Sequence, residues 1–145
     1  MATERRAEVT WNGDLMSGSG TIDRVGTGAF GPLEVSWPAR AEDASAGKTS
    51  PEELLAAAHA ACFSMALAGG LAKGGNAPEQ LSTSATVTFV PGTGITRIVL
   101  SVRGTVPGLD ADGFREAAEA AKAGCPVSQA LAGVEEIALV AELDE

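Results

Sequence analysis

The feature that most constrains the fold is an alanine-rich stretch, almost free of helix breakers, at residues 54–73. A clear helix start precedes it: Ser50 is a good N-cap, Pro51 suits the first helical position, and Glu53 completes a Ser-x-x-Glu capping box. Gly74 follows as a stop. Alanines lie on nearly every side of this helix, and a helix that is apolar on most sides is buried on most sides. We therefore expect one long central helix with the rest of the chain packed around it.

Short strands are predicted on both sides of the central helix, because runs of β-branched, aromatic or alternating residues are separated by glycine- and proline-rich turns. The predicted strands are at residues 7–11, 20–24, 33–37, 82–90, 95–106 and 136–143, and two further helices are predicted at 112–123 and 125–131. The segment 40–48 has the composition of a polar loop. Strands that occur in hairpin runs, rather than alternating with helices, indicate an α+β fold with mainly antiparallel sheet on the central helix. Without an internal repeat or linker, residues 1–145 are predicted to form a single domain.

The charge of the chain excludes several kinds of partner. Its 19 acidic and 10 basic residues give a net charge of −9, whereas nucleic acids and anionic membranes are bound by Lys- and Arg-rich surfaces. The first residues are charged and lack the apolar run of a secretory signal. Every apolar stretch of membrane length is interrupted by Gly, His or Lys. We expect a soluble, cytoplasmic protein that binds neither nucleic acid nor membrane.

The chain has only two cysteines, Cys62 in the central helix and Cys125 before Pro126. Cytosolic thiols are kept reduced, so such a pair is more often redox-active or metal-binding than structural. Cys125 is predicted to be the N-cap of a short helix, where free amide groups and the helix dipole lower the pKa of a thiol. Local reasoning therefore favours Cys125 as the more acidic thiol, but it does not decide which sulfur reacts first. Cys62, taken alone, could be a small buried apolar residue.

A metal site is the main alternative for these sulfurs. His59, the only histidine, lies one helical turn before Cys62. Two cysteines and one histidine provide three ligands, whereas a structural zinc takes four, typically in closely spaced pairs. We therefore expect no metal and no cofactor, and we expect His59 to be a packed or hydrogen-bonded helical residue rather than a catalytic base.

Two long motifs resemble the OsmC/Ohr family of thiol peroxidases. The first is Thr-Ser-Pro-Glu-Glu-Leu-Leu-Ala-Ala-Ala-His-Ala-Ala-Cys-Phe-Ser-Met-Ala-Leu at residues 49–67, and the second is Ala-Lys-Ala-Gly-Cys-Pro-Val-Ser at residues 121–128. Val106-Pro107-Gly108 and the opening Trp11-Asn-Gly match as well. Residues 17–20, Ser-Gly-Ser-Gly, lack the early arginine of the Ohr branch, whereas Arg40 precedes the central helix as in the OsmC branch.

The resemblance implies a cysteine-based peroxidase that reduces organic hydroperoxides, with hydrogen peroxide as a further candidate substrate. Cys62 would attack the peroxide and become a sulfenic acid, which Cys125 would convert to a disulfide. A small or protein-bound thiol or dithiol would then reduce that disulfide. Arg40 would hold Cys62 as a thiolate, and Glu52 would fix Arg40 by an ion pair. Without the resemblance, Arg40 would be read as a solvated loop residue and Glu52 as an ordinary first-turn acid.

Helix geometry adds an expectation about assembly. Glu52 and Cys62 are ten residues apart on one helix, which is about 15 Å of rise, too far for a glutamate side chain to span. If Glu52 helps to build the Cys62 site, it must come from a second copy of the chain and act there on the partner's Arg40–Cys62 pair. The resemblance agrees, since the family forms intertwined homodimers with two interfacial sites.

Two other functions remain open at this point. One is a thiol hydrolase or transferase that uses Cys62 with His59 as its base, although the sequence offers no third group to orient the histidine. The other is a non-catalytic dimeric binding module that keeps the fold. Turnover of peroxide discriminates both from a peroxidase.

Overall fold

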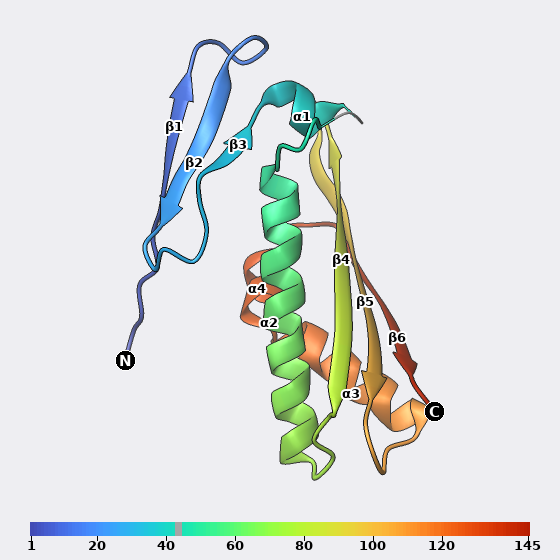
Figure 1. The fold of residues 1–145 in the computed structure, drawn as a ribbon. Helices are drawn as coiled ribbons and strands as arrows, with labels where there is room; N and C mark the ends of the chain where they lie inside the picture. Colours follow the sequence, from blue (N-terminus) through green and yellow to red (C-terminus); the bar gives the residue numbers. More distant parts are fainter. Residues whose placement is uncertain (43–44) are drawn as a thin grey trace. The chain divides into compact units, whose positions relative to one another are not determined.

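A computed structural model describes residues 1–42 and 45–145, and it divides the chain into two compact units, Met1–Leu54 and Leu55–Glu145. Both units contain sheet and helix (Figure 1). The architecture is therefore α+β, as predicted. The predicted loop at 40–48 lies partly outside the described residues.

The first unit contains a three-stranded antiparallel sheet in the order β1-β2-β3, formed by β1 (Ala7–Asn12), β2 (Ser19–Val25) and β3 (Leu33–Val35). The third strand is two residues shorter than predicted, because Ser36 caps a short helix, α1 (Trp37–Ala41). The Ser36 hydroxyl accepts a hydrogen bond from the Ala39 amide at 3.2 Å, and Pro38 lies in the first turn, where it loses no helical hydrogen bond. Arg40 is thus on a helix, which corrects the prediction of a loop.

The long helix α2 (Pro51–Lys73) begins in the first unit and continues into the second. Ser50 caps it as predicted, since its hydroxyl accepts from the Glu53 amide at 3.1 Å. The Glu53 carboxylate accepts instead from the Thr49 hydroxyl at 2.9 Å. Only one half of the predicted capping box is therefore formed, and Thr49 takes the place of the second half.

The second unit contains the sheet β4-β5-β6, formed by β4 (Gln80–Val90), β5 (Gly94–Thr105) and β6 (Glu136–Leu143). β4 and β5 form the predicted antiparallel hairpin, whereas β5 and β6 are parallel. Parallel neighbours need a crossover connection, and α3 (Ala111–Gly124) with α4 (Pro126–Ala130) supplies it. The pairing is mainly antiparallel, as predicted, and this crossover accounts for the exception.

The core of the second unit lies between the sheet and the helices α2 and α3, which cover one face of it (Figure 1). Its buried members include Leu100 and Val102 of β5, Phe63, Leu67 and Leu71 of α2, and Phe114, Ala118 and Ala121 of α3. Gly104 of β5 lies directly under Phe114, since a Cβ atom there would stand 2.6 Å from two carbons of the Phe114 ring. Cys125 belongs to the same core.

Within the described part of the chain, α2 is the one helix that is long and apolar enough to cross a membrane. The central helix of a globular core has the same length and composition. Phe63 and Leu67 of α2 have no exposed surface and pack in the core, which fits the second reading.

Candidate redox site

The two cysteines are in contact in the second unit. The Cys62 Sγ of α2 lies 2.9 Å from the Cys125 Sγ, and both residues are reduced thiols. Helix α3 ends at Gly124, and the Cys125 amide still donates to the Ala121 carbonyl at 2.9 Å, which aims the side chain into the core. Cys125 is fully buried and Cys62 partly so. A disulfide sulfur pair is about 2.05 Å apart, so a shift of about 1 Å would allow the bond to form.

A second polar contact joins the same two helices next to the sulfurs. The His59 Nε2 lies 2.7 Å from the Ser128 Oγ, and both residues are buried. His59 and Cys62 are three residues apart on α2, and Cys125 and Ser128 are three residues apart at the start of α4, so the two pairs meet in register. His59 is therefore the packed, hydrogen-bonded histidine that we expected. Sequence reasoning missed Ser128, although the matching spacings His-x-x-Cys and Cys-x-x-Ser are visible in the sequence.

The surroundings of the two sulfurs move their pKa values in opposite directions. Burial raises the pKa of the Cys62 thiol, and the hydrogen bond between the sulfurs raises it further. Burial also acts to raise the pKa of Cys125, but hydrogen bonding from Cys62, from the amides of Ser128 and Val127, and from the Ser128 hydroxyl outweighs it and lowers the pKa. In the surroundings that the second unit provides, Cys125 is thus the more acidic thiol, as its place at a helix start predicts.

Burial lowers the pKa of His59. The imidazole is therefore neutral at neutral pH, with one ring nitrogen protonated. Its Nδ1 has no hydrogen-bond partner among the described residues.

Arg40 and Glu52 are brought together in the first unit. The Arg40 Nη2 lies 2.7 Å from the Glu52 Oε1, and its Nε lies 3.0 and 3.2 Å from the two carboxylate oxygens. The Glu52 side chain is 8% exposed and that of Arg40 is 31% exposed. The guanidinium also lies 5.9 Å from the centre of the Trp37 ring, a cation–π contact within α1. The expected ion pair is present, but it forms within one chain, whereas helix geometry alone led us to expect Glu52 at the arginine of a second copy.

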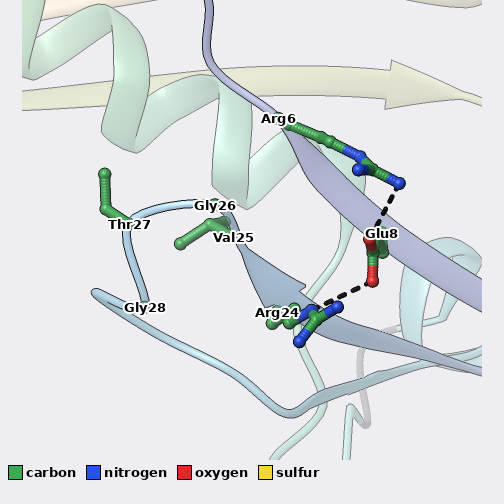
Figure 2. Close-up of a pocket in the computed structure, with 7 residues that line it drawn as sticks. All are labelled: Arg6, Glu8, Arg24, Val25, Gly26, Thr27 and Gly28. Carbon is green, nitrogen blue, oxygen red and sulfur yellow. Dashed lines mark hydrogen bonds and ion pairs between the residues drawn. The ribbon is translucent and has the colours of Figure 1, made fainter.

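Other candidate sites have no cysteine. A cavity of about 400 Å³ lies in the first unit beside β1 and β2, where Glu8 bridges Arg6 and Arg24 (Figure 2). These side chains are largely exposed and complete their own ion pairs. Across the described residues, no three His, Cys, Asp or Glu side chains gather in a way that could hold a metal ion.

The fold and the thiol pair define the class: an α+β protein with a two-cysteine redox site. The family model for OsmC-like proteins matches residues 43–139, and the chain belongs to the OsmC family. It is 40% identical over 134 residues to "Peroxiredoxin OsmC" of Escherichia coli (strain K12), which covers 90% of this chain and 92% of that protein. The resemblance drawn from the two cysteine motifs is thereby confirmed.

Solved structures share the fold. The OsmC-like protein from Mycoplasma pneumoniae superposes with a TM-score of 0.70 at 16% identity, over 99% of this chain and 98% of that one. The organic hydroperoxide resistance protein OhrB of Bacillus subtilis superposes with a TM-score of 0.63 at 25% identity, over 96% and 98% of the two chains.

Proposed function

We propose that this protein is a cysteine-based peroxidase that reduces organic hydroperoxides with electrons from an external thiol. The observation that carries the proposal is the 2.9 Å contact between two reduced sulfurs that are 63 residues apart in the sequence. Its relatives include a protein named as a peroxiredoxin and another named for organic hydroperoxide resistance. Together these support a site in which one sulfur is oxidised and the other resolves the product.

In the first step, the Cys62 thiolate attacks the terminal oxygen of the hydroperoxide. The O–O bond breaks, the oxygen stays on the sulfur as a sulfenic acid, and the alkoxide leaves and takes up a proton to become the alcohol. Partial exposure of Cys62 supports its assignment as the attacking sulfur, because the fully buried Cys125 offers no surface to a substrate.

In the second step, Cys125 attacks the sulfur of the sulfenic acid. The S–S bond forms while the S–O bond breaks, and the departing hydroxide takes up a proton to become water. Two reductant thiols then exchange with the disulfide, are themselves oxidised to a disulfide, and return both cysteines to thiols.

Cys62 needs a further group, because its own surroundings raise the pKa of its thiol. We assign that role to Arg40, whose guanidinium would favour the thiolate and stabilise the departing alkoxide. Glu52 holds Arg40 with a two-point ion pair, the geometry that best fixes a guanidinium. Since the Arg40–Glu52 pair forms within one chain, we propose that it acts as a unit at the Cys62 of a second copy.

A homodimer, with residues 1–145 acting as one domain in each copy, therefore forms part of the proposal. Met65 of α2 is 74% exposed, and Ala58 and Ala61 of the same helix are also exposed. Such a helix face is suited to burial against another chain. A cytoplasmic location fits the chemistry, because it supplies the reducing thiols on which turnover depends.

A thiol hydrolase built on Cys62 and His59 is less well supported. The His59 Nε2 is bonded to Ser128 rather than to Cys62, and burial lowers the pKa of the imidazole, so no base is directed at Cys62.

The test is a comparison of two single-cysteine variants. Cys125→Ser should consume one equivalent of an organic hydroperoxide and give a sulfenic acid that a carbon nucleophile can trap. Cys62→Ser should consume almost none. The reverse behaviour would exchange the roles of the two sulfurs, and no consumption by the unaltered protein would exclude a peroxidase. Turnover with monothiol and dithiol reductants would then identify the class of reductant.

A further inference from the structure

Two buried polar side chains next to the sulfurs have no part in the mechanism given above. His59 has no exposed surface and Ser128 is 8% exposed, and their polar atoms lie 2.7 Å apart. Ser128 is the third residue of α4, one turn after Cys125, so its hydroxyl lies on the side of the helix that carries the sulfur. Burial of polar groups is costly unless each is hydrogen-bonded, so this arrangement requires an explanation.

The direction of the hydrogen bonds follows from the partners of the imidazole. Nδ1 has no partner among the residues that the structure describes, and a buried N–H without an acceptor is rarer than a buried acceptor without a donor. The proton of the neutral ring is therefore assigned to Nε2, which donates to the Ser128 Oγ. The Ser128 hydroxyl is then free to donate in turn, and the Cys125 sulfur is the acceptor beside it.

We propose that His59 and Ser128 are positioning residues for Cys125, and that they direct one hydrogen bond from Ser128 onto its sulfur so that it is ready to attack the sulfenic acid on Cys62. The inference rests on the proposed function and assigns that site two residues which act on the second step only. The chain of contacts runs from His59 Nε2 to Ser128 Oγ to Cys125 Sγ to Cys62 Sγ, and it joins α2 to α4 twice.

This arrangement affects the two steps differently. Resolution needs Cys125 as a thiolate, because only the thiolate is a good nucleophile. A hydroxyl that donates to sulfur stabilises the thiolate more than the thiol, and the histidine behind it fixes the direction of the hydroxyl. The attack of Cys62 on peroxide uses no atom of His59 or Ser128, so its rate should not depend on them.

The experiment measures Cys125 directly. In a Cys62→Ser background, the rate of alkylation of Cys125 by iodoacetamide is recorded against pH with and without Ser128→Ala. We expect its midpoint to move to higher pH in Ser128→Ala, because a donor to the thiolate is lost. In the two-cysteine protein, a single turnover with limiting hydroperoxide should show disulfide formation slowed by roughly ten-fold or more. The rate of the first oxidation should be unchanged.

Ser64→Ala is the matched control. Ser64 is also on α2, two residues after Cys62, and its hydroxyl donates to the Thr83 hydroxyl at 2.7 Å. It should lose a comparable hydrogen bond and leave the alkylation midpoint of Cys125 in place. His59→Gln, which retains an N–H donor, should behave more like the parent than His59→Leu, and this pair serves if Ser128→Ala does not fold. An unchanged midpoint, or an unchanged rate of disulfide formation, in a folded variant would overturn the inference. The alkylation arm needs no peroxide, so it decides the inference even if the proposed peroxidase activity fails.

Discussion

At the residue scale, the reactivity of each sulfur depends on which charged or hydrogen-bonding groups reach it. Cys125 has its own donors, at the start of α4. Cys62 has burial and a neighbouring sulfur, both of which raise the pKa of its thiol. A peroxidase that begins at Cys62 therefore needs a cation from elsewhere, and Arg40 is held ready by Glu52.

The first prediction concerns that arginine. In a Cys125→Ser background, Arg40→Ala should move the alkylation midpoint of Cys62 to higher pH, because a guanidinium near the sulfur favours the thiolate. Arg40→Lys should restore the shift only in part, since an ammonium keeps the charge but not the two-point contact with Glu52. Arg24→Ala is the control, because Arg24 also pairs with a glutamate in the first unit. If Arg40→Ala leaves the midpoint unchanged, Arg40 is not at the site and His59 returns as the candidate activating group.

The second prediction concerns the buried imidazole. Burial lowers the pKa of His59 below its unfolded value of about 6.5, so the unfolded chain binds a proton before the folded one does. The free energy of unfolding should therefore be at its full value above about pH 6.5 and should fall as the pH is lowered toward the folded pKa. Urea unfolding between pH 7 and pH 5 would measure the slope. His59→Gln does not titrate and should show a shallower slope, whereas equal slopes would contradict the assignment.

At the scale of elements, the site depends on how β5 seats α3, because α3 leads directly into Cys125. The third prediction is that Gly104→Ala destabilises the protein by about 1–3 kcal/mol, because its Cβ would stand 2.6 Å from the Phe114 ring. Gly133→Ala is the control, since nothing in the described part of the chain lies within 4 Å of a Cβ placed there. Denaturant midpoints would measure both variants. A Gly104→Ala protein as stable as the control would show that Phe114 can move without loss.

Elements with strong local signals could be predicted from the sequence. The strand Glu136–Leu143 has the predicted bounds, and α3 differs by one residue at each end. Helix α1 was missed because its signal, Ser36 before Trp37 and Pro38, adjoins a strand-like run. The parallel pairing of β5 with β6 and the contact of His59 with Ser128 depend on how distant segments approach, which periodicity does not contain. The cysteine contact was expected only through family resemblance.

At the scale of the whole molecule, the proposed site uses two copies of the chain. The fourth prediction is that inactive Glu52→Ala and Cys62→Ser chains, mixed so that subunits exchange, regain activity toward half of the wild-type value per heterodimer. One chain would supply an intact Arg40–Glu52 pair and the other would supply Cys62. Peroxide turnover measures the recovery, and mass measurement of the exchanged species checks that heterodimers form.

A chain that carries both substitutions provides the control. Mixed with wild type, it should give heterodimers with no complete site if the site is shared, whereas a site within one chain would leave half of the activity. Complete exchange without recovered activity in the first mixture would return Glu52 to an ordinary first-turn acid.

The separation of 63 residues between the two sulfurs has a consequence for the unfolded chain. When Cys62 and Cys125 join, the intervening segment becomes a covalent loop, and a loop of this size removes conformational entropy equivalent to about 4 kcal/mol from the unfolded state. The oxidised protein would thus resist unfolding more strongly than the resting one. Each catalytic cycle would alternate between an open polymer and a looped one, and the reductant would restore the more easily unfolded of the two.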